Sequence, residues 1–300
     1  MNFVITGATG QLGRLVVEAL LRRNVAADQI IATGRETSRI LDLADRGVLL
    51  RRVDYDDPGS LRDVFTGGSR VLLVSGSEFG RRVDQHRKVI DAAKASRVGL
   101  LAYTSVANAG RTGIALAADH QATERALDES GLPFTLLRNS WYLENYTGQV
   151  AAYLERGVVL GSAGDGKVSA ATREDYAEAA AAVLVSGEHA GKIYELGGDE
   201  AFGYSDLASA VAKAAARPVT YEELPFDEYV GALVGAGLPD AYAAALADSD
   251  LGIARGELLV PTQDLSRLIG RPTTSMPDAI GAAVRALSDD SSSEAGLRAS

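Results

Sequence analysis

Short apolar segments alternate with amphipathic segments along the first half of the chain. The short apolar segments predict strands at Phe3–Thr6, Ile30–Thr33, Val48–Val53, Val71–Val74, Leu100–Thr104 and Phe134–Leu137. Helical patterns such as Arg82–Ser96 and Leu116–Ser130 lie between them. Strands that alternate with helices in this way predict an α/β fold, with a doubly wound parallel sheet that helices cover on both faces.

This alternation breaks after about residue 140. The later pattern predicts helices at Glu174–Val185 and Ser205–Ala216 and strands at Ile193–Leu196 and Val219–Leu224, after a loop-rich stretch at residues 157–166. Ser205 is placed to cap one helix, and Ser275 with Asp278 forms a candidate capping box for a later one.

The two patterns predict two domains. We expect a first domain over residues 1–140, to which some later segments return, and a smaller α+β C-terminal lobe over residues 141–287. Residues 288–300 are polar and rich in Ser and Asp, so a disordered tail is expected there.

The start of the chain carries a glycine pattern between the first strand and the first helix. Gly7, Gly10 and Gly13 follow the strand at three-residue spacing. This is the arrangement of Rossmann-type folds, in which the first glycine allows a turn, the second lets backbone approach a pyrophosphate, and the third packs helix on strand. Free N–H groups at the helix start would then meet the phosphates. The predicted cofactor-binding residues here are Gly7, Ala8, Thr9, Gly10, Gln11, Leu12 and Gly13.

Arg35 is the first charged residue after the second predicted strand. In such folds an acidic residue at this strand end binds the ribose 2′-hydroxyl of NAD, whereas an arginine accommodates the 2′-phosphate of NADP. No Asp or Glu occurs at residues 31–34, so we expect NADPH to be preferred over NADH. The alternative is an arginine in a solvated loop.

The ends of the third and fourth predicted strands carry further candidates. Asp54 is a candidate for the adenine edge, although it and its acidic neighbours would equally cap the next helix, which starts near Pro58. Ser75, Gly76 and Ser77 are expected beneath the nicotinamide ribose, unless they form an ordinary turn.

A motif for acid–base catalysis is missing from the sequence. Short-chain dehydrogenases usually carry Tyr-x-x-x-Lys, in which the lysine lowers the tyrosine pKa so that the phenol exchanges a proton with the substrate. None of the eleven tyrosines has a lysine four residues later. A proton-coupled alcohol dehydrogenase is therefore disfavoured, and a reaction governed by hydride positioning is favoured.

The segment after the sixth predicted strand combines aromatic and amide side chains at the sheet edge where ligands bind in open α/β folds. Asn139 is a candidate donor to a carbonyl or carboxamide, and Trp141 and Tyr142 are candidates to wall a flat substrate. The alternative is a packed aromatic hinge between the lobes. Thr104 and Ser105 end the fifth strand and are candidate oxyanion donors. Arg138 and Lys167 are further candidates to contact the cofactor, and a surface hairpin is the alternative for Lys167.

Composition limits the class of protein. The net charge of −10 argues against nucleic acid as a partner, and no apolar run approaches the roughly 18–20 residues of a membrane span. The absence of cysteine excludes disulfides and thiolate metal ligands, and the three scattered histidines give no metal-ligand spacing. We expect a soluble, cytoplasmic monomer or homodimer without a metal.

Several motifs taken together resemble the bacterial NAD(P)H:quinone oxidoreductases of type 2, which are atypical short-chain dehydrogenases of the NmrA-like group. These motifs lie at residues 6–13, 85–94, 102–105, 135–142, 144–146, 163–167, 171–177, 238–240, 247–250 and 268–274. The resemblance implies a Rossmann domain, a smaller C-terminal lobe, a preference for NADPH, and reduction of quinones without flavin or metal. Gly34, where the family often has a bulkier residue, and the polar tail after Leu287 depart from the pattern.

The resemblance leaves three hypotheses about function. The first is an NADPH-dependent oxidoreductase that passes hydride directly to a quinone-like acceptor. The second is an NADP(H)-sensing regulator with little turnover, as in other members of the wider NmrA-like group. The third is a reductase of another flat conjugated acceptor, such as the triphenylmethane dyes that similar members reduce. For the first hypothesis the candidate catalytic residues are Thr104, Ser105, Asn139, Trp141 and Tyr142.

Overall fold

The computed structural model describes residues 1–76, 78 and 80–298, with the side chains of residues 58 and 290–298 left out. In this part of the chain, seven parallel strands form one sheet in the order β3-β2-β1-β4-β5-β6-β8. The strands are β1 (Phe3–Ile5), β2 (Ile30–Gly34), β3 (Leu49–Arg52), β4 (Arg70–Leu73), β5 (Leu100–Val106), β6 (Phe134–Asn139) and β8 (Ile193–Leu196). A separate parallel pair contains β7 (Val158–Gly161) and β9 (Thr220–Glu223).

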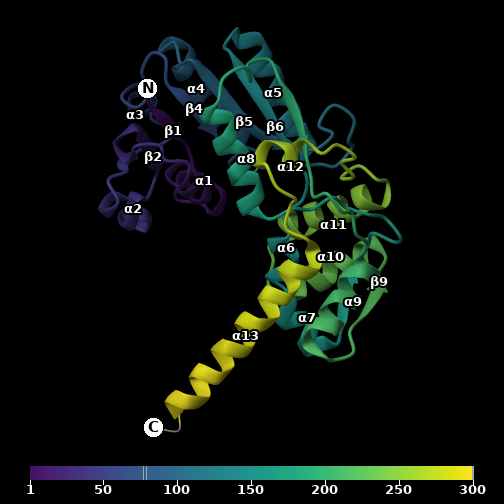
Figure 1. The fold of residues 1–300 in the computed structure, drawn as a ribbon. Coiled ribbons are helices and arrows are strands. Elements are labelled where there is room, and N and C mark those ends of the chain that lie inside the picture. Colours follow the sequence, from purple (N-terminus) through teal and green to yellow (C-terminus); the bar gives the residue numbers. More distant parts are fainter. Residues whose placement is uncertain (77, 79, 299–300) are drawn as a thin grey trace.

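Helices connect the strands of the large sheet and cover both of its faces (Figure 1). They are α1 (Gln11–Arg22), α2 (Leu41–Asp45), α3 (Pro58–Arg62), α4 (Arg82–Ala95), α5 (Ala117–Ser130), α8 (Arg173–Val185) and α12 (Asp264–Ile269), with 3₁₀ turns η1 (Ala27–Gln29) and η2 (Thr37–Ile40). The predicted doubly wound parallel α/β fold is confirmed.

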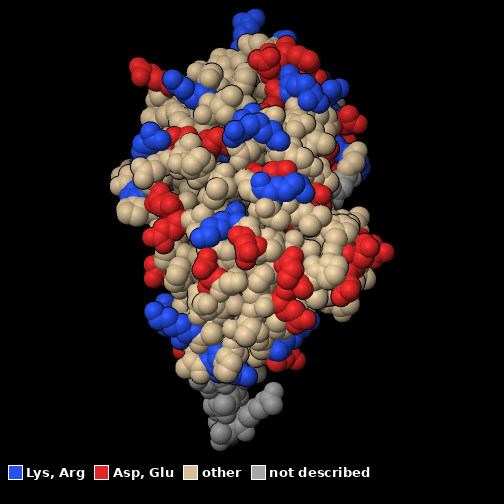
Figure 2. Space-filling model, turned by 90° about the vertical axis from the view of Figure 1, so that its right-hand side faces the viewer, with Lys and Arg blue, Asp and Glu red and all other residues tan. Residues whose placement is uncertain are grey.

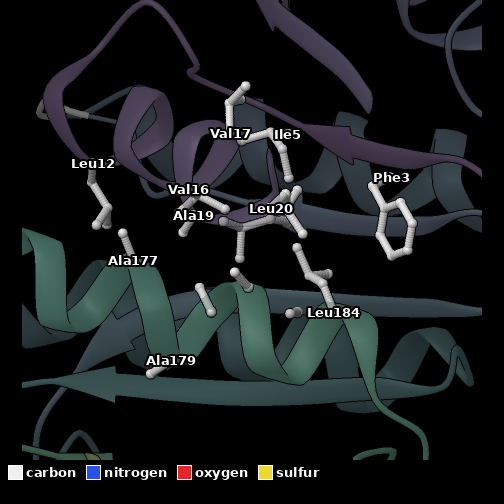
Figure 3. Packing of buried hydrophobic residues seen from close by; sticks show 14 of the residues in the cluster. Phe3, Ile5, Leu12, Val16, Val17, Ala19, Leu20, Ala177, Ala179 and Leu184 are labelled. Carbon is white, nitrogen blue, oxygen red and sulfur yellow. The ribbon is translucent and has the colours of Figure 1, made fainter. Parts of the chain in front are cut away.

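One face of the sheet is covered by α1 and α8, which pack against each other. Figure 3 shows Leu12, Val16 and Leu20 of α1 directed toward α8, which carries Ala177 and Leu184 on the facing side. Alanine fills most of the buried positions of α8, and its small side chain lets the two helices approach closely. The opposite face is covered by α3, α4 and α5, whose apolar residues form a second core with the sheet.

The chain order reverses between β1 and β4 in the centre of the sheet. From β1 the chain builds outward through β2 to β3, and it then returns to add β4, β5 and β6 on the other side. In open α/β sheets, ligands bind in the crevice outside the carboxyl ends of the strands at such a reversal. The glycine turn after β1 and the segment after β4 both lie at this point.

A smaller lobe holds most of the second half of the chain (Figure 1). It contains β7, β9 and the helices α6 (Glu144–Thr147), α7 (Val150–Arg156), α9 (Tyr204–Ala215), α10 (Phe226–Gly235), α11 (Asp240–Ala254) and α13 (Met276–Arg298). In its core, Tyr146 meets Phe202 and Tyr204 edge to face, with ring centroids 5.5 and 5.8 Å apart. Asp250 of α11 accepts hydrogen bonds from the Tyr204 hydroxyl (2.6 Å) and the Ser162 N–H (2.9 Å), and so ties α11 to α9 and β7.

Segments from the second half also return to the first domain. β8 joins the edge of the large sheet beside β6, and α8 and α12 pack on the same face as α1. A boundary at residue 140 therefore separates the lobes only in part, because residues 173–196 and 264–269 complete the first domain.

The structure differs from the sequence expectation at three places. β7 forms within the stretch expected to be loop, because it pairs with β9, about sixty residues later, and no local pattern records that partner. Helix α9 starts at Tyr204, where Asp206 accepts the Gly203 N–H (2.9 Å), so the predicted Ser205 cap was wrong. The Ser275–Asp278 capping box is confirmed.

The third difference is at the C-terminus. Helix α13 continues to Arg298, through most of residues 288–300, where the sequence predicts a disordered tail. The stretch is polar but contains no proline, so a helix already held at Met276, Ile280 and Val284 can continue outward. Figure 1 shows α13 leading away from the smaller lobe.

Acidic and basic side chains are interspersed over the face of the molecule seen in Figure 2. Neither sign forms a continuous stripe on that face. A basic stripe is the usual electrostatic footprint of a nucleic-acid-binding protein. In the described residues, no helix is both long enough and apolar enough to cross a membrane.

Candidate active site

A cleft of about 620 Å³ opens at the carboxyl ends of β1, β2 and β4. We call it the cleft, and its walls include Gly7, Thr9, Gly10, Gln11, Leu12, Gly13, Gly34, Arg35, Asp54, Tyr55, Ser75, Gly76, Glu78, Arg82, Gln85, Tyr142 and Arg173. The walls thus come from the glycine turn, from the ends of the next three strands, from α4, from Tyr142 after β6 and from Arg173 at the start of α8.

Three glycines shape the floor of the cleft. Gly7 adopts a φ of +61°, which glycine tolerates without steric cost. A Cβ on Gly13 would lie 2.4 Å from the Gly7 carbonyl oxygen, so only glycine lets α1 pack this closely on the turn. A Cβ on Gly10 would lie 3.3 Å from the same oxygen and would occupy space at the mouth of the cleft.

The N-terminus of α1 points into the cleft with no side-chain cap. The Gly10 N–H donates to the Gly7 carbonyl (2.9 Å) and the Arg14 N–H to the Gly10 carbonyl (3.1 Å). The N–H groups of Gln11, Leu12 and Gly13 lie in the first turn, where a helix offers no carbonyl acceptor. An anionic pyrophosphate fits this place, because it would accept these hydrogen bonds at the positive end of the helix dipole.

Arg35 lies at the tip of β2 with its side chain 65% exposed. Its guanidinium is 2.5 Å from a carboxylate oxygen of Glu78, which also lines the cleft. Gly34 lies directly beneath Thr9, because a Cβ at residue 34 would be 2.5 Å from the Thr9 methyl carbon. The glycine turn therefore rests on the end of β2, which accounts for the small residue before Arg35.

Asp54 follows β3 and lines the cleft beside Tyr55. Its carboxylate accepts the Asp56 N–H at 3.0 Å, whereas Asp57 accepts the Gly59 N–H (2.9 Å) and caps α3. The helix-capping role thus belongs to Asp57, and Asp54 faces the cleft. Burial raises the pKa of the Tyr55 phenol to about 12, so this residue is a neutral part of the wall.

The backbone after β4 is held from two sides. The Ser75 N–H donates to the Thr104 hydroxyl (2.9 Å), and the Gly76 N–H donates to His86 Nε2 (3.0 Å). Thr104 lies behind Ser75 and does not line the cleft. These two bonds fix the strand end against which a nicotinamide ribose would lie in this type of fold.

A second cavity, of about 640 Å³, adjoins the cleft. We call it the inner cavity. Its walls include Ser105, Val106, Leu116, His120, Asn139, Ser140, Trp141 and Asn145, together with Pro239, Ala241, Tyr242, Ala245 and Leu246 from α11 and the residue before it. Ser75, Arg82, Tyr142 and Arg173 line both spaces. A molecule that reaches the inner end of the cleft would therefore meet one bound in the inner cavity.

Tyr142 and Arg173 form one side of the junction between the two spaces. The Arg173 guanidinium carbon lies 4.5 Å from the centre of the Tyr142 ring, which is a cation–π contact. Arg173 also pairs with Glu144 (3.3 Å). Tyr176 meets Tyr142 edge to face, with the ring centroids 5.4 Å apart. These contacts hold the Tyr142 ring at the junction, and burial raises the pKa of its hydroxyl.

Arg82 forms the other side of the junction. Its side chain is only 6% exposed, and its guanidinium lies 3.8 Å from the Asp119 carboxylate. A guanidinium keeps its charge even when it is buried. The positive charge of Arg82 is among the causes that lower the pKa values of His86 and His120. The junction therefore holds two guanidinium groups, those of Arg82 and Arg173, each paired with a carboxylate.

Asn139 brings an unpaired amide oxygen to the wall of the inner cavity. It ends β6 and is 5% exposed, and its side-chain oxygen is buried without a hydrogen-bond partner in the described structure. Leaving a buried polar atom unpaired costs about 1–3 kcal/mol, so such an atom in a cavity wall is suited to a ligand. Trp141 lines the same cavity two residues later.

Ser105 lines the inner cavity but is already engaged. Its hydroxyl donates to a carboxylate oxygen of Glu124 at 2.6 Å. Glu124 in turn pairs with Arg138 (2.6 Å), which also pairs with Glu195 (3.0 Å). Because the Ser105 proton is directed toward Glu124, the hydroxyl presents only lone pairs to the cavity and is poorly placed to stabilise an oxyanion.

Two buried histidines lie behind and beside the junction. His86 is fully buried and accepts the Gly76 N–H at Nε2, so its Nδ1 carries the proton toward the Thr123 hydroxyl (2.9 Å). His120 lines the inner cavity, and its Nδ1 lies 2.8 Å from the Tyr103 hydroxyl. Burial is the main cause that lowers both histidine pKa values to about 3. If Tyr103 donates to Nδ1, neutral His120 carries its proton on Nε2.

Comparisons with known proteins agree with this geometry. Residues 7–186 match the NAD(P)H-binding family. The chain belongs to this family. It is 46% identical over 276 residues to quinone oxidoreductase 2 of Escherichia coli, covering 92% of this chain and 96% of that protein. The resemblance to the type 2 quinone oxidoreductases is confirmed.

Solved structures give the same result. The NADPH-dependent quinone oxidoreductase of Escherichia coli in complex with NADPH superposes with a TM-score of 0.90 at 46% identity, covering 93% of this chain and 98% of that one. The triphenylmethane reductase of Citrobacter sp. in complex with NADP(H) gives a TM-score of 0.87 at 35% identity, covering 94% and 100%.

Most of the predicted residues meet at the cleft and the inner cavity of this family member. Of the predicted set, the cleft walls include Gly7, Thr9, Gly10, Gln11, Leu12, Gly13, Arg35, Asp54, Ser75, Gly76 and Tyr142. The inner cavity collects Ser105, Asn139 and Trp141, together with Ser75 and Tyr142 again. Ser77 lies outside the described residues.

Four predicted residues do not reach these walls. Ala8 is fully buried beneath the turn and contributes its N–H to the Thr33 carbonyl (2.8 Å). Thr104 supports Ser75 from behind. Arg138 forms ion pairs with Glu124 and Glu195. Lys167 is exposed to solvent and lines neither the cleft nor the inner cavity. Strand ends and hairpins place a backbone, but the direction of a side chain depends on its tertiary partners.

Sequence reasoning missed Arg82, Arg173 and the wall supplied by α11. Arg82 lies in a helix that reads as an ordinary solvated one, and nothing in the local pattern shows that its guanidinium is buried. Arg173 is the first residue of α8, after the Thr172 cap, and the sequence analysis included it only as part of a motif. The α11 residues reach the inner cavity across about a hundred positions of sequence. In the described residues, no group of three or more His, Cys, Asp or Glu side chains could hold a metal ion.

Proposed function

We propose that this chain is an NADPH-dependent oxidoreductase that transfers hydride directly to a quinone-like acceptor, without flavin or metal. The observation that carries the proposal is the shared wall of the cleft and the inner cavity at Ser75, Arg82, Tyr142 and Arg173. Two molecules bound in these spaces would touch, and direct transfer needs that proximity. The names of the relatives support the same chemistry.

The residues of the cleft would hold the cofactor in an extended form. The first-turn N–H groups of α1 would bind the pyrophosphate. The Arg35 guanidinium would bind the 2′-phosphate, which would replace part of its ion pair with Glu78. Asp54 would meet the adenine side. Ser75 and Gly76 would lie against the nicotinamide ribose, held by Thr104 and His86. When bound there, NADPH supplies a hydride.

The inner cavity would orient a flat acceptor. Trp141 and Tyr142 offer aromatic surface to a conjugated ring, and Leu246 and Leu116 add apolar contact. Catalysis would come mainly from holding the acceptor at the junction in a reactive orientation. No group is needed that removes a proton from an alcohol, which agrees with the missing Tyr-x-x-x-Lys motif.

The same residues would stabilise the charge that develops on the acceptor. Hydride addition to a quinone leaves negative charge on oxygen, and the buried Arg82 guanidinium lies at the junction to offset it. The amide N–H groups of Asn139, as distinct from its unpaired oxygen, and the Nε2–H that His120 carries when Tyr103 donates to Nδ1 would be further donors in the same wall. Because the pKa of His120 is lowered to about 3, it would serve as a neutral donor at physiological pH.

The test is NADPH oxidation, followed by absorbance, with simple quinones, a triphenylmethane dye and a ketone as acceptors and NADH run in parallel. We expect turnover with quinones but not with the ketone, and a lower KM for NADPH than for NADH. Faster turnover of the dye than of any quinone would support a dye reductase. Tight NADP(H) binding by calorimetry without turnover of any acceptor would support a sensor instead.

We also propose that the protein works in the cytoplasm as a monomer or homodimer, without nucleic acid or membrane as a partner. The chain contains no cysteine, so its fold requires no oxidising compartment. The pieces of both spaces come from one chain, so a second copy is not needed to build them. Cell fractionation and light scattering on the purified protein test these two points.

A further inference from the structure

A third space lies in the smaller lobe and adjoins the inner cavity. We call it the lobe cavity, and its volume is about 520 Å³. Trp141, Asn145, Tyr242 and Leu246 line both the inner cavity and the lobe cavity. The two spaces are thus separated by no more than single side chains.

One face of α11 runs along both cavities. Tyr242, Leu246 and Asp250 are spaced by four residues and so lie one above the other on the helix. The first two contact both spaces, and Asp250, one turn later, contacts only the lobe cavity. A ligand part that follows this helix face away from the inner cavity therefore enters the lobe cavity.

Part of the wall of the lobe cavity is apolar and comes from a helix that is not buried. Helix α10 is rich in apolar residues, yet none of its residues is buried. Its Ala232 and Leu233 line the cavity, and Leu160 of β7 lies in the wall too. The cavity also has charged groups in its wall: Asp250 accepts hydrogen bonds from Tyr204 and the Ser162 N–H, and Glu144 pairs with Arg173, so both carboxylates are engaged in the fold.

The volumes argue for an occupant larger than one ring system. A space of 300–1,000 Å³ suits a drug-sized ligand, and the inner cavity of about 640 Å³ alone exceeds what a compact two-ring quinone fills. The lobe cavity adds an extension, with Leu160, Ala232 and Leu233 in its wall, that a bare ring would leave empty. An aliphatic chain on the ring would cover the half-exposed side of α10.

We propose that the lobe cavity binds the aliphatic side chain of an acceptor whose ring lies in the inner cavity. This inference rests on the proposed function, because it takes the inner cavity as the site of the ring. The enzyme would then prefer alkyl-substituted quinones to unsubstituted ones. The preference would arise in binding, through apolar contact with Ala232, Leu233 and Leu160.

The experiment compares naphthoquinones that carry methyl, propyl and pentyl side chains, with NADPH held constant. Each buried methylene contributes about 0.8 kcal/mol, which is about fourfold in affinity, and not every methylene will be fully buried. We expect kcat/KM to rise at least tenfold from methyl to pentyl, mainly through KM. Ala232→Phe in α10 and Leu160→Phe in β7 should each remove this gain without slowing the methyl compound.

Val234→Phe is the matched control, because Val234 lies on the same helix, is 37% exposed and does not line the lobe cavity. The Val234→Phe variant should keep the full rise in kcat/KM from the methyl to the pentyl compound. A second readout needs no turnover: Trp141, the sole tryptophan, lies in the wall between the two cavities, so its fluorescence should be quenched by bound quinone in the presence of NADP⁺.

The outcomes separate the inference from the function on which it rests. Reduction of the methyl compound with no gain from longer chains, or a gain that survives both cavity variants, would overturn the side-chain site and leave the reductase intact. No reduction of any quinone would overturn the proposed function. In that case, chain-dependent quenching that Ala232→Phe abolishes would still support the side-chain site, and quenching independent of chain length would overturn it.

Discussion

At the scale of single residues, two arginines of the candidate site differ in their surroundings. Arg35 is exposed and paired with Glu78, whereas Arg82 is buried between two spaces. Arginine therefore occurs in two different surroundings in this chain, one exposed and one buried. At the edge of the cleft it can select a phosphate by bidentate hydrogen bonds, and at the junction it supplies a fixed charge.

Arg35→Ala should weaken NADPH binding much more than NADH binding. Hydrogen bonds to charged groups contribute about 1.5–3 kcal/mol, so the KM for NADPH should rise roughly 10- to 100-fold while that for NADH changes little. Steady-state kinetics with both cofactors measures this difference. Arg39→Ala is the control, because Arg39 is also exposed near the end of β2 but lines neither space. Equal losses for both cofactors would contradict the 2′-phosphate assignment.

Arg82→Met should lower kcat by about 100-fold, the usual effect of losing one group that stabilises a developing oxyanion. Arg82→Lys keeps the charge and should recover part of the rate. Single-turnover kinetics with NADPH and a simple quinone measures the transfer step itself. Arg81→Met, at an exposed neighbouring position, should leave the rate near that of the wild type. An unchanged rate in Arg82→Met would remove this residue from the mechanism.

At the scale of elements, the cleft depends on how closely α1 approaches β1. The approach is set by two features, the glycine turn below and the alanine-rich α8 on the other side of α1. Both are short-range packing features, so small changes in volume should have large effects. Substitutions at Gly13 and Gly10 therefore test two different effects: the packing of α1 on the turn at Gly13, and cofactor binding at Gly10.

Gly13→Ala should destabilise the protein by several kcal/mol, because its Cβ would lie 2.4 Å from the Gly7 carbonyl oxygen and α1 would have to move. Gly10→Ala meets the same oxygen at 3.3 Å and places alanine at the N-cap of α1, where glycine is preferred, so it should cost about 1 kcal/mol, less than Gly13→Ala. It should still weaken cofactor binding, because the methyl group faces the cleft. Urea unfolding without cofactor and calorimetry with NADPH measure the two effects.

At the scale of the whole molecule, three buried titratable groups couple stability to pH. Burial lowers the pKa of His86 and His120 to about 3 and raises the pKa of Asp250 to about 6. The unfolded values are about 6.5 for histidine and 3.9 for aspartate. Between about pH 4 and pH 6, unfolding thus takes up two protons at the histidines and releases one at Asp250, so stability falls as the pH falls.

Lowering the pH from 7.5 to 5 should therefore reduce the free energy of unfolding by on the order of 2 kcal/mol from these groups. His120→Gln removes one of the two histidine contributions and should make the loss smaller. Asp250→Asn removes the opposing contribution and should make the loss larger. Urea unfolding at both pH values measures each variant against its own value at pH 7.5. A loss that is the same in all three proteins would show that other groups control the pH dependence.

The sequence by itself determined the sheet of the first domain, the glycine turn and the residues at the strand ends. These features are local, since a buried strand, a tight turn and an amphipathic helix each leave a short-range pattern. The position of Arg35 at the tip of β2 could be predicted for the same reason, because it follows a strand with a clear local pattern. The predicted roles of these residues toward cofactor and acceptor stay predictions.

Only the tertiary structure decided where side chains point and which distant segments share a wall. It buried Arg82 in a helix that reads as solvated, engaged Arg138 with two carboxylates, and brought α11 across the inner cavity. It also paired β7 with β9 and continued α13 past residue 288. Each outcome depends on partners far away in the sequence, and so no local pattern carries it.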